Sequence, residues 1–387
     1  MRIVLPLQGF AVTGAAVLLL SSLALGAEIE VAQAKTDISL RLEVETAIGK
    51  GLTWLATQQK PEGFWSMQEN PAISALVLTA FQGDQSGYYK RKFEPVANKG
   101  FDYILKCVKP DGGIYVKDMI NYNTSISMMA LLVANRPEFE PTIRKARNYI
   151  IGLQDTLGDN PLDGGVGYGG TYKHSDITDT SFALEALYYS RRLNNDLAGG
   201  EVKDLNWKAA VRFISRTQNL PEYNDQKWAS DDPDNVGGFV YFPGNSKAGE
   251  VKLPNGKVAL ASSGSVSYAG LMSYLYAQMG KNDPRVKAVY DYLVRHYTLE
   301  ENPGMGKQGL FYYYHTMAKA LNIYGVENLP LKDGKSVNWR RELAKKLLDE
   351  QKGDGFWVND NGRFLEKDPN LVTAYAVITL EIISHGL

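Results

Sequence analysis

The residues best suited to acid–base chemistry form one run, Ser175-Asp176-Ile177-Thr178-Asp179-Thr180-Ser181, with His174 directly before it. Carboxylates and an imidazole placed close together can hold, donate and accept a proton, and a histidine beside an aspartate is a common proton carrier. The run also begins an apolar stretch, where a carboxylate is favoured for stability alone because it caps free backbone N–H groups. Catalysis and capping are both open for Asp176 and Asp179, and His174 is alternatively an ordinary loop residue.

Aromatic residues accompany this run, since the chain has 23 tyrosines and several stand where apolar stretches begin. Aromatic faces there can stabilise a positive charge by cation–π attraction or stack on sugar rings, although core packing explains many of them. For His315 the alternative is a core histidine with satisfied hydrogen bonds. The residues expected to contact a ligand are Tyr168, Tyr172, Tyr268, Tyr313 and His315.

The composition argues against several classes of function. Lys plus Arg number 42 and Asp plus Glu 43, and no basic block is present, so a nucleic-acid partner has no electrostatic support. Cys107 is the only cysteine, which rules out an intrachain disulfide and a cysteine-rich zinc site. The acidic cluster Asp231, Asp232 and Asp234 lacks the regular spacing of a calcium loop and fits a solvated turn. We predict neither a metal nor a cofactor.

The N-terminus has the pattern of a signal peptide. Arg2 precedes an uncharged stretch from Ile3 to Ala27, and small residues suited to cleavage occur near positions 26 and 34. The stretch just reaches the about 20 apolar residues of a membrane span, so a retained anchor is the alternative. We therefore expect residues 1–34 to direct export to the periplasm or the medium, and residues 35–387 to form a single domain.

A glycine followed closely by an aromatic residue occurs six times along the chain. An amphipathic stretch precedes each copy, and a stretch that is apolar nearly all round follows it. A helix without a polar face has to be buried on every side, so the amphipathic helices are predicted to surround the apolar ones. The six copies are Gly63-Phe64-Trp65, Gly113-Ile114-Tyr115, Gly165-Val166-Gly167-Tyr168, Gly238-Phe239-Val240-Tyr241, Gly309-Leu310-Phe311-Tyr312 and Gly355-Phe356-Trp357.

This pattern predicts an all-α fold, an α/α toroid of about six helix pairs with inner and outer rings. An open solenoid would expose its apolar inner helices, so closure is favoured. The inner helices are expected over residues 72–81, 126–134, 182–189, 266–279, 312–324 and 371–383.

Two insertions interrupt the regular spacing near the middle of the chain. The segment from Pro221 to Val236 is acidic and holds Trp228, while Val240 to Val258 contains the hairpin turn signal Pro254-Asn255-Gly256-Lys257. Both lie on the side of the glycine–aromatic copies, so we expect them to form a rim or lid over one mouth of the ring.

Two of the copies extend to Gln-x-x-x-Gly-x-Trp, at Gln59 to Trp65 and at Gln351 to Trp357. This motif resembles the repeat signature of squalene-hopene cyclases and of the β-subunits of protein prenyltransferases. The resemblance covers about residues 40 to 387. It implies the toroid, a central cavity suited to isoprenoid chains, and structural roles for the Gln and Trp side chains.

The acidic run is similar to the Asp-x-Asp-Asp-Thr-Ala motif of the cyclases, whose middle aspartate protonates an alkene or epoxide. Thr178 stands at that position here. An alcohol does not protonate an alkene, so the resemblance implies that Asp176, Asp179 or His174 would have to supply the proton.

The prenyltransferase branch implies a zinc site made by Asp, Cys and His. His315-Thr316 resembles its histidine part, but the stretch from Ser262 to Tyr268 that should carry the partners has neither Asp nor Cys. The sequence therefore argues against zinc-dependent prenyl transfer.

Three functions follow as hypotheses. The first is an exported protein that binds or transforms an isoprenoid or lipid-like substrate in a central cavity, with peripheral contact to a membrane. The second is a carbohydrate lyase or hydrolase on an α/α toroid, which would use a wide cleft with acids such as Asp225 and Asp231 and the aromatic Trp228. The third is a non-catalytic binding or scaffold protein.

Overall fold

The computed structural model describes residues 38–84, 86–193, 203–253, 256, 258–331 and 334–387. The predicted signal peptide, residues 1–34, lies outside the described residues, as does most of the turn at residues 254–257. None of the helices in the described ranges is both long enough and apolar enough to cross a membrane.

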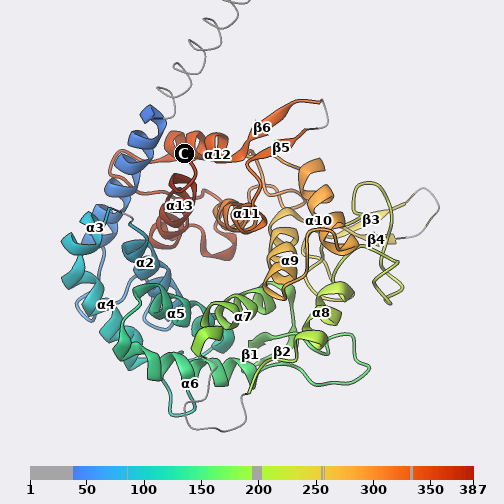
Figure 1. Ribbon diagram of the computed structural model, residues 1–387, viewed down its shortest axis with the longest axis horizontal. Coiled ribbons are helices and arrows are strands. Elements are labelled where there is room, and N and C mark those ends of the chain that lie inside the picture. Colours follow the sequence, from blue (N-terminus) through green and yellow to red (C-terminus); the bar gives the residue numbers. More distant parts are fainter. Residues whose placement is uncertain (1–37, 85, 194–202, 254–255, 257, 332–333) are drawn as a thin grey trace, which may run out of the picture.

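Six helices form the inner ring (Figure 1). They are α2 (Pro71–Gly83), α5 (Ile120–Ala134), α7 (Ile177–Ser190), α9 (Gly264–Tyr276), α11 (Leu310–Tyr324) and α13 (Pro369–Ser384). Each packs against the next, and α13 packs against α2, so the ring is closed. The helices are buried nearly all round; in α2 only Thr79 and Gly83 are not fully buried. The predicted α/α toroid is confirmed.

The outer ring consists of helices that bury one face only. They are the helix over residues 38–57, α4 (Glu94–Lys106), α6 (Glu140–Ile151), α8 (Trp207–Arg216), α10 (Pro284–Arg295) and α12 (Trp339–Glu350), with the short α3 (Tyr88–Lys92) before α4. In α8, for example, Ala209, Ala210, Phe213 and Ile214 face inward. This one-sided burial is what the amphipathic pattern predicts.

The remaining regular structure is small. Antiparallel pairs are formed by β1 (Gly167–Gly169) with β2 (Tyr172–Ser175), β3 (Glu250–Lys252) with β4 (Val258–Leu260), and β5 (Asn328–Pro330) with β6 (Ser336–Asn338). Single 3₁₀ turns are η1 (Pro137–Phe139), η2 (Arg191–Leu193) and η3 (Arg363–Leu365).

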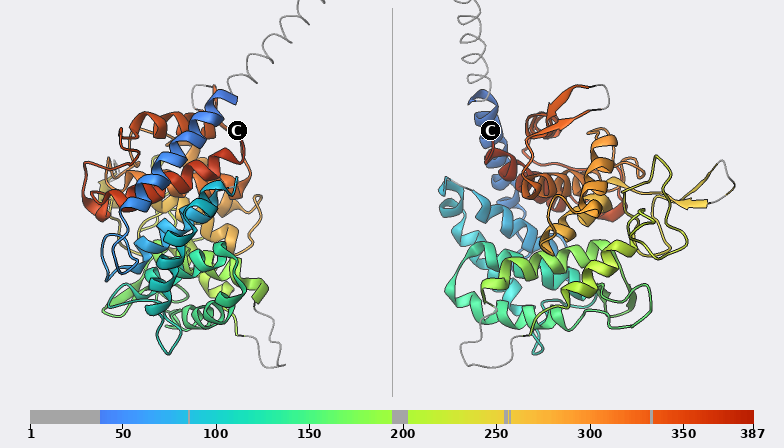
Figure 2. Two further views of the ribbon diagram at one scale, coloured as in Figure 1. Left: turned by 90° about the vertical axis from the view of Figure 1, so that its left-hand side faces the viewer. Right: turned by 45° about the vertical axis from the view of Figure 1, so that its right-hand side comes forward.

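The predicted hairpin, β3–β4, is present but does not cover a mouth of the ring. Figures 1 and 2 show it projecting outward from the edge of the molecule. Its base is held near the outer ring, because the side-chain amide of Asn219, just beyond α8, donates to the carbonyl of Leu260 over 2.9 Å. The hairpin itself is therefore not a lid, although Lys247, from the same insertion, lines a cavity at the N-terminal ends of the inner helices.

The acidic insertion is bound to the end of α8 by its own side chains. Arg216 donates to both carboxylate oxygens of Asp225, with Nη2 2.7 Å from the nearer one, and Asn219 accepts from the backbone of Ser230. Asp232 accepts from the side chain of Asn235. These bonds hold the acidic insertion against the end of α8.

Five junctions between outer and inner helices share one construction. Each contains a glycine with φ between 88° and 101°, and a Cβ there would come under 3.0 Å from a backbone carbonyl oxygen of the next outer helix. Two residues later a backbone N–H donates, over 2.9–3.0 Å, to a hydroxyl in the first turns of the inner helix. The glycines are Gly63, Gly112, Gly164, Gly237 and Gly355, and the hydroxyls belong to Ser74, Thr124, Thr180, Ser267 and Thr373.

Three of the glycines singled out in the sequence, Gly113, Gly165 and Gly238, are thus one residue beyond the structurally equivalent position. The prediction for Gly309 is wrong. Gly309 is the N-cap of α11 and lies in the connection from α10 to α11, which is built differently from the other five junctions. At that helix start, Glu366 accepts from the backbone N–H of Tyr312 over 2.8 Å.

Four glutamines connect neighbouring outer helices. The side-chain amide of each donates to its own junction glycine and to a carbonyl in or at the start of the next outer helix, over 2.9–3.1 Å. Gln59 and Gln351 were expected from the sequence, whereas Gln154 and Gln218 are separated from their glycines by inserted loops and escaped a search at fixed spacing. Gln351 bonds to Ala47 in the helix over residues 38–57, which joins the last junction to the first outer helix.

Candidate functional site

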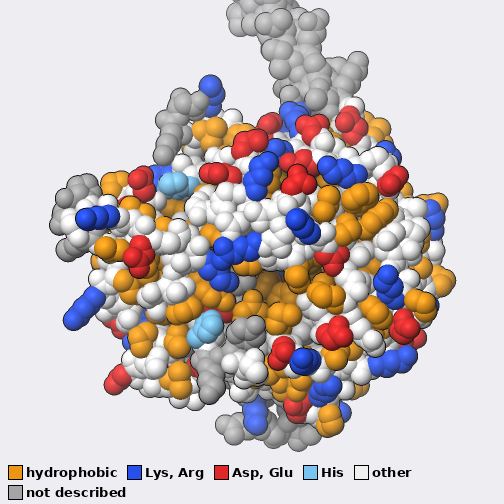
Figure 3. Space-filling model, turned by 180° about the vertical axis from the view of Figure 1, so that it is seen from behind, with side chains coloured by type: hydrophobic (Ala, Val, Ile, Leu, Met, Phe, Trp, Pro, Cys, Tyr) orange, Lys and Arg blue, Asp and Glu red, His pale blue; other side chains and the backbone are white. Residues whose placement is uncertain are grey.

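A cavity of about 230 Å³, which we call the axial cavity, lies at the N-terminal ends of the inner helices. On the face seen in Figure 3, a hollow of mainly hydrophobic side chains lies near the centre. Aromatic and aliphatic side chains make up most of its wall, together with a few hydroxyl and amide groups. The lining includes Tyr122, Tyr168, Thr178, Phe182, Lys247, Val266, Tyr312, Phe364, Leu371 and Tyr375.

Four aromatic side chains lie across the axis of the toroid, below this cavity. Phe182 lies 5.3 Å from Tyr122 and 6.2 Å from Tyr312 between ring centroids, and Tyr312 lies 5.9 Å from Tyr375. A hydrogen bond between Tyr122 and Tyr375 completes the circuit. We call these four residues, from α5, α7, α11 and α13, the aromatic floor. Phe182 and Tyr375 also line a second cavity on its other side.

Asp176 is the N-cap of α7 and is fully buried. Its Oδ1 accepts from the backbone N–H groups of Thr178 and Asp179, both over 2.9 Å, and its Oδ2 accepts from the Tyr241 hydroxyl over 3.1 Å. The capping interpretation is therefore realised at Asp176. Burial raises the pKa of Asp176, while its hydrogen bonds from Asp179 and Tyr241 and the charge of Lys247 oppose that rise.

Asp179 is also fully buried, but neither of its carboxylate oxygens accepts a hydrogen bond from a donor in the described part of the chain. Burial raises its pKa well above the usual value, and the charge of Asp176 and a hydrogen bond between the two carboxyl groups act in the same direction. Of the two carboxyl groups, Asp179 is the one that has no hydrogen-bond donor to stabilise its charged form, so burial favours its protonated form.

A layer of polar side chains separates this pair from the axial cavity. Tyr168 lines the cavity and hydrogen-bonds Tyr241, which in turn bonds Asp176. The ammonium of Lys247 lies 3.3 Å from the centre of the Tyr241 ring and 5.3 Å from that of Phe364. Burial lowers the pKa of Lys247, while the charges of the aspartate pair raise it. The amine thus balances the negative charge behind the wall.

The segment η3 shapes the rim of the cavity. Phe364 and Leu365 both adopt left-handed backbone angles, with φ of 59° and 64°, and their side chains are 42% and 44% exposed. Two such residues in succession are unusual for side chains other than glycine. The strained turn holds two apolar side chains at the mouth of the cavity.

The predicted site residues are divided among three places. Tyr168 lines the axial cavity, and Asp176 and Asp179 lie behind its wall, whereas Thr178 lines it. His174 is partly exposed on β2, with its ring 6.0 Å from that of Tyr241 and 4.7 Å from that of Phe242. The side chain of Tyr172 lies outside the described part of the structure.

The sequence predicts that Tyr268 and Tyr313 contact a ligand, but neither side chain lines the axial cavity. They pack on each other, with ring centroids 5.7 Å apart, and the hydroxyl of Tyr313 donates to the carbonyl of Thr298 over 2.9 Å, on the outer side of α11. Both are fully buried. We therefore remove them from the candidate site.

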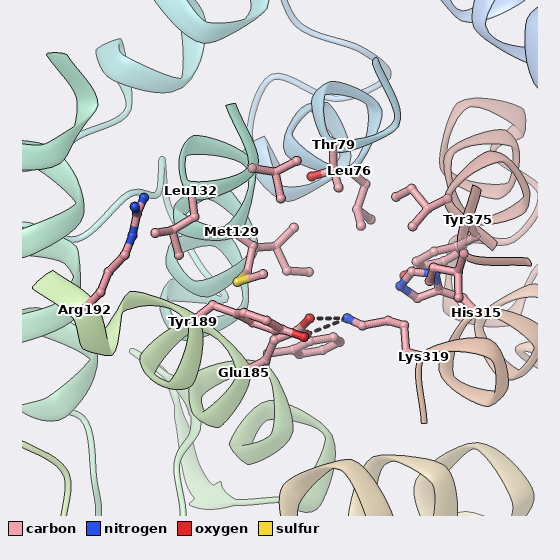
Figure 4. A pocket seen from close by; sticks show the side chains of 15 residues that line it. Leu76, Thr79, Met129, Leu132, Glu185, Tyr189, Arg192, His315, Lys319 and Tyr375 are labelled. Atoms are coloured by element: carbon pink, nitrogen blue, oxygen red, sulfur yellow. Dashed lines mark hydrogen bonds and ion pairs between the residues drawn. The ribbon is translucent and has the colours of Figure 1, made fainter. Parts of the chain in front are cut away.

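His315 lines the second cavity, which has a volume of about 350 Å³ and lies towards the C-terminal ends of the inner helices; we call it the opposite cavity (Figure 4). Its ring lies 5.1 Å from that of Tyr375 in the aromatic floor. Across the cavity, the ammonium of Lys319 pairs with the carboxylate of Glu185 at 2.5 Å. His315 and the aspartate pair are therefore on different sides of the aromatic floor.

Comparison with known proteins identifies the fold. No family model matches the sequence, and no curated protein matches it. Among solved structures, the type II terpene cyclase MstE from Scytonema aligns with a TM-score of 0.53 at 10% identity, over 90% of this chain and 99% of that one. An α-1,6-mannanase of Salegentibacter sp. HEL1_6 aligns with a TM-score of 0.56 at 8% identity, over 88% of this chain and 99% of that one. The GH76 α-mannanase BT2949 of Bacteroides thetaiotaomicron gives 0.53 at 13%, over 88% and 96%. The chain thus has the toroid of terpenoid cyclases and of mannanases, and at these identities the likeness establishes the fold alone.

Sequence reasoning missed Lys247, Phe364 and two members of the aromatic floor, Phe182 and Tyr375, as cavity residues. Lys247 and Phe364 come from loops whose approach to the axis depends on tertiary structure. The floor residues had a usable signal, since aromatic side chains near the third to seventh positions of several inner helices can meet at the axis.

Proposed function

We propose that the axial cavity binds an isoprenoid or similarly lipid-like chain. The observation that supports this proposal is the wall itself, which is mainly aromatic and aliphatic and is closed at one end by the aromatic floor. Transfer of an apolar chain from water into such a cavity gains about 25 cal/mol for each Å² of apolar surface that is buried. An isoprenoid also suits stacked aromatic faces, which adapt to its branched methyl groups.

A polysaccharide is less well supported as the substrate. Glycoside hydrolysis uses two carboxyl groups that flank the scissile bond. The described residues that line the axial cavity include no Asp or Glu, and the aspartate pair is buried behind the wall. The acids of the inserted loop, such as Asp225, are bonded to Arg216.

For conversion of the bound chain, Asp179 is our candidate acid and Asp176 its partner, because burial raises the pKa of Asp179 well above its usual value and no donor stabilises its charged form. His174 is retained as a candidate through Tyr241, which lies between its ring and Asp176. A binding protein without turnover is the alternative, since Thr178 and not a carboxyl group faces the cavity. We also propose that the protein is exported and takes its ligand from a membrane surface.

Binding is tested with two hydrocarbons, farnesene and squalene, by displacement of a fluorescent probe from the purified protein. The variant Val266→Trp fills the axial cavity from α9 and is expected to weaken binding about tenfold or more. Tyr268→Phe is the matched control, because this residue is on the same helix but faces away from the cavity. The proposal is wrong if neither hydrocarbon binds, or if the two variants bind equally well.

Turnover is tested separately by incubation with squalene and detection of isomeric products by gas chromatography and mass spectrometry. Products that disappear in both Asp179→Asn and Asp176→Asn would establish acid catalysis by the pair. Binding without products would favour the non-catalytic alternative. Release of sugars from α-1,6-mannan, lost in the same variants, would instead establish the carbohydrate alternative.

A further inference from the structure

The opposite cavity contains a buried polar atom without a partner. Nδ1 of His315 forms no hydrogen bond with any group in the described part of the chain, although the side chain is only 5% exposed. A buried nitrogen of this kind is unfavourable unless a partner satisfies it. His315 lies in the cavity wall, so a bound molecule can reach it.

An ion pair, whose two charges cancel, lies beside this nitrogen. Lys319 is one helical turn after His315 on α11, so both side chains project from the same face. Figure 4 shows Lys319 reaching across the cavity to Glu185 on α7, and the two groups are 2.5–2.6 Å apart. Burial and the charge of Lys319 lower the pKa of His315 well below its usual value, so its imidazole is neutral.

The rest of the wall is mainly apolar. Its other polar side chains are Thr79, whose hydroxyl donates to the carbonyl of Ala75, and the exposed Arg192, whose guanidinium donates to Asn135. Leu76, Ile126, Met129 and Ile378 come from α2, α5 and α13 and face the same space. At the outer end Val133 and Tyr189 are 36% and 44% exposed, so the cavity opens to solvent there. A ligand therefore needs an apolar body and a single small polar group.

The polar group that fits is a hydroxyl. It donates one hydrogen bond and accepts another, so it can serve a neutral imidazole nitrogen and an ammonium together. A carboxylate would lie close to the carboxylate of Glu185, which already neutralises Lys319, and a pure hydrocarbon would leave the imidazole unsatisfied.

We propose that the opposite cavity binds an apolar alcohol, with its hydroxyl donating to His315 and accepting from Lys319. The hydrocarbon part contacts the side chains of α2, α5 and α13, and the aromatic floor separates it from the axial cavity. The inference does not depend on the proposed function, because it concerns residues on the other side of that floor.

The first experiment follows the histidine side chains by NMR. The chain has four histidines, so selective ¹⁵N labelling gives few ring signals, and the signal that disappears in His315→Phe identifies His315. The probes are dodecanol, dodecane and dodecanoate. Dodecanol is expected to shift the ring nitrogens of His315 and to saturate, and the other two are expected to bind about tenfold more weakly. The proposal is overturned if His315 does not respond to dodecanol, or if dodecanoate or dodecane binds as tightly.

The second experiment compares two variants with the same substitution. His315→Phe is expected to weaken dodecanol binding about tenfold and to leave the weak binding of dodecane unchanged. His296→Phe, a histidine that stacks on Tyr292 away from this cavity, is expected to bind both probes as the wild type does. Equal loss of dodecanol and dodecane binding in His315→Phe would show a purely steric role and would contradict the proposal.

Discussion

The axial and opposite cavities share the aromatic floor but stabilise buried charge in opposite ways. At the N-terminal ends of the inner helices, burial raises the pKa of both Asp176 and Asp179, and Asp176 accepts from backbone N–H groups. Towards the C-terminal ends, Lys319 extends into the cavity and meets Glu185. Because all inner helices run in the same direction, their dipoles favour negative charge at the first end and positive charge at the second. The parallel arrangement of the inner helices thus makes the two ends of the toroid axis chemically different sites.

The largest expected effect is on stability at the opposite cavity. In Lys319→Met the carboxylate of Glu185, only 9% exposed, loses its cationic partner, and we expect the free energy of unfolding to fall by about 3 kcal/mol. Urea denaturation measures the change. The double variant Lys319→Met with Glu185→Leu should recover most of the loss, because no uncompensated charge remains. Equal stability of the single and double variants would contradict the assigned pairing.

At the axial cavity the corresponding variant is Asp176→Ala, which leaves two backbone N–H groups and the Tyr241 hydroxyl without their acceptor. We expect a loss of about 2 kcal/mol in the same assay. Asn caps helices as well as Asp does, so Asp176→Asn should retain more than half of that stability. If the two substitutions are equally harmful, charge rather than capping dominates at this position.

A crossed binding experiment separates the cavities directly. Val266→Trp fills the axial cavity and Met129→Trp fills the opposite one. Each should weaken its own probe about tenfold, farnesene in the first case and dodecanol in the second, and leave the other probe unaffected. Probe displacement measures both. Loss of both probes in both variants would mean that one ligand occupies a continuous channel through the floor.

The smallest effect is a change in the pH dependence of stability. Burial raises the pKa of Asp179, so the folded protein keeps a proton that the unfolded chain loses above about pH 4. This contribution is complete at low pH and declines as the pH rises through the pKa of the folded state. Asp179→Asn lacks the proton, so its stability should fall less than that of the wild type between about pH 5 and about pH 8.

The control for this experiment is Asp225→Asn. The hydrogen bond from Arg216 lowers the pKa of Asp225, so this group titrates only under more acidic conditions. Its removal should leave the slope between about pH 5 and about pH 8 unchanged. An Asp179→Asn variant with the wild-type slope would show that Asp179 is ionised in the folded protein.

The fold could be predicted from sequence because helix pairs repeat their pattern of burial, and apolar helices need neighbours on all sides. The site could be predicted only in part. Asp176 and Asp179 stand out as acids at a helix start, but the sequence does not show that one caps the helix while the other holds a proton. Tyr268 and Tyr313 were misplaced because a helix that is apolar all round carries no periodic signal of which face meets the axis. Lys247 comes from an insertion, and its position depends on contacts far apart in the chain.

The hydrogen bond from Gln351 to Ala47 has a consequence for how the molecule comes apart. In an open array of helical units, the terminal units have one neighbour each and fray first. Here the last junction binds the first outer helix, so every unit has two neighbours and no end is available from which unravelling can start. We expect a single cooperative unfolding transition in place of stepwise loss of units, and a circularly permuted chain cut at another junction should keep the same fold.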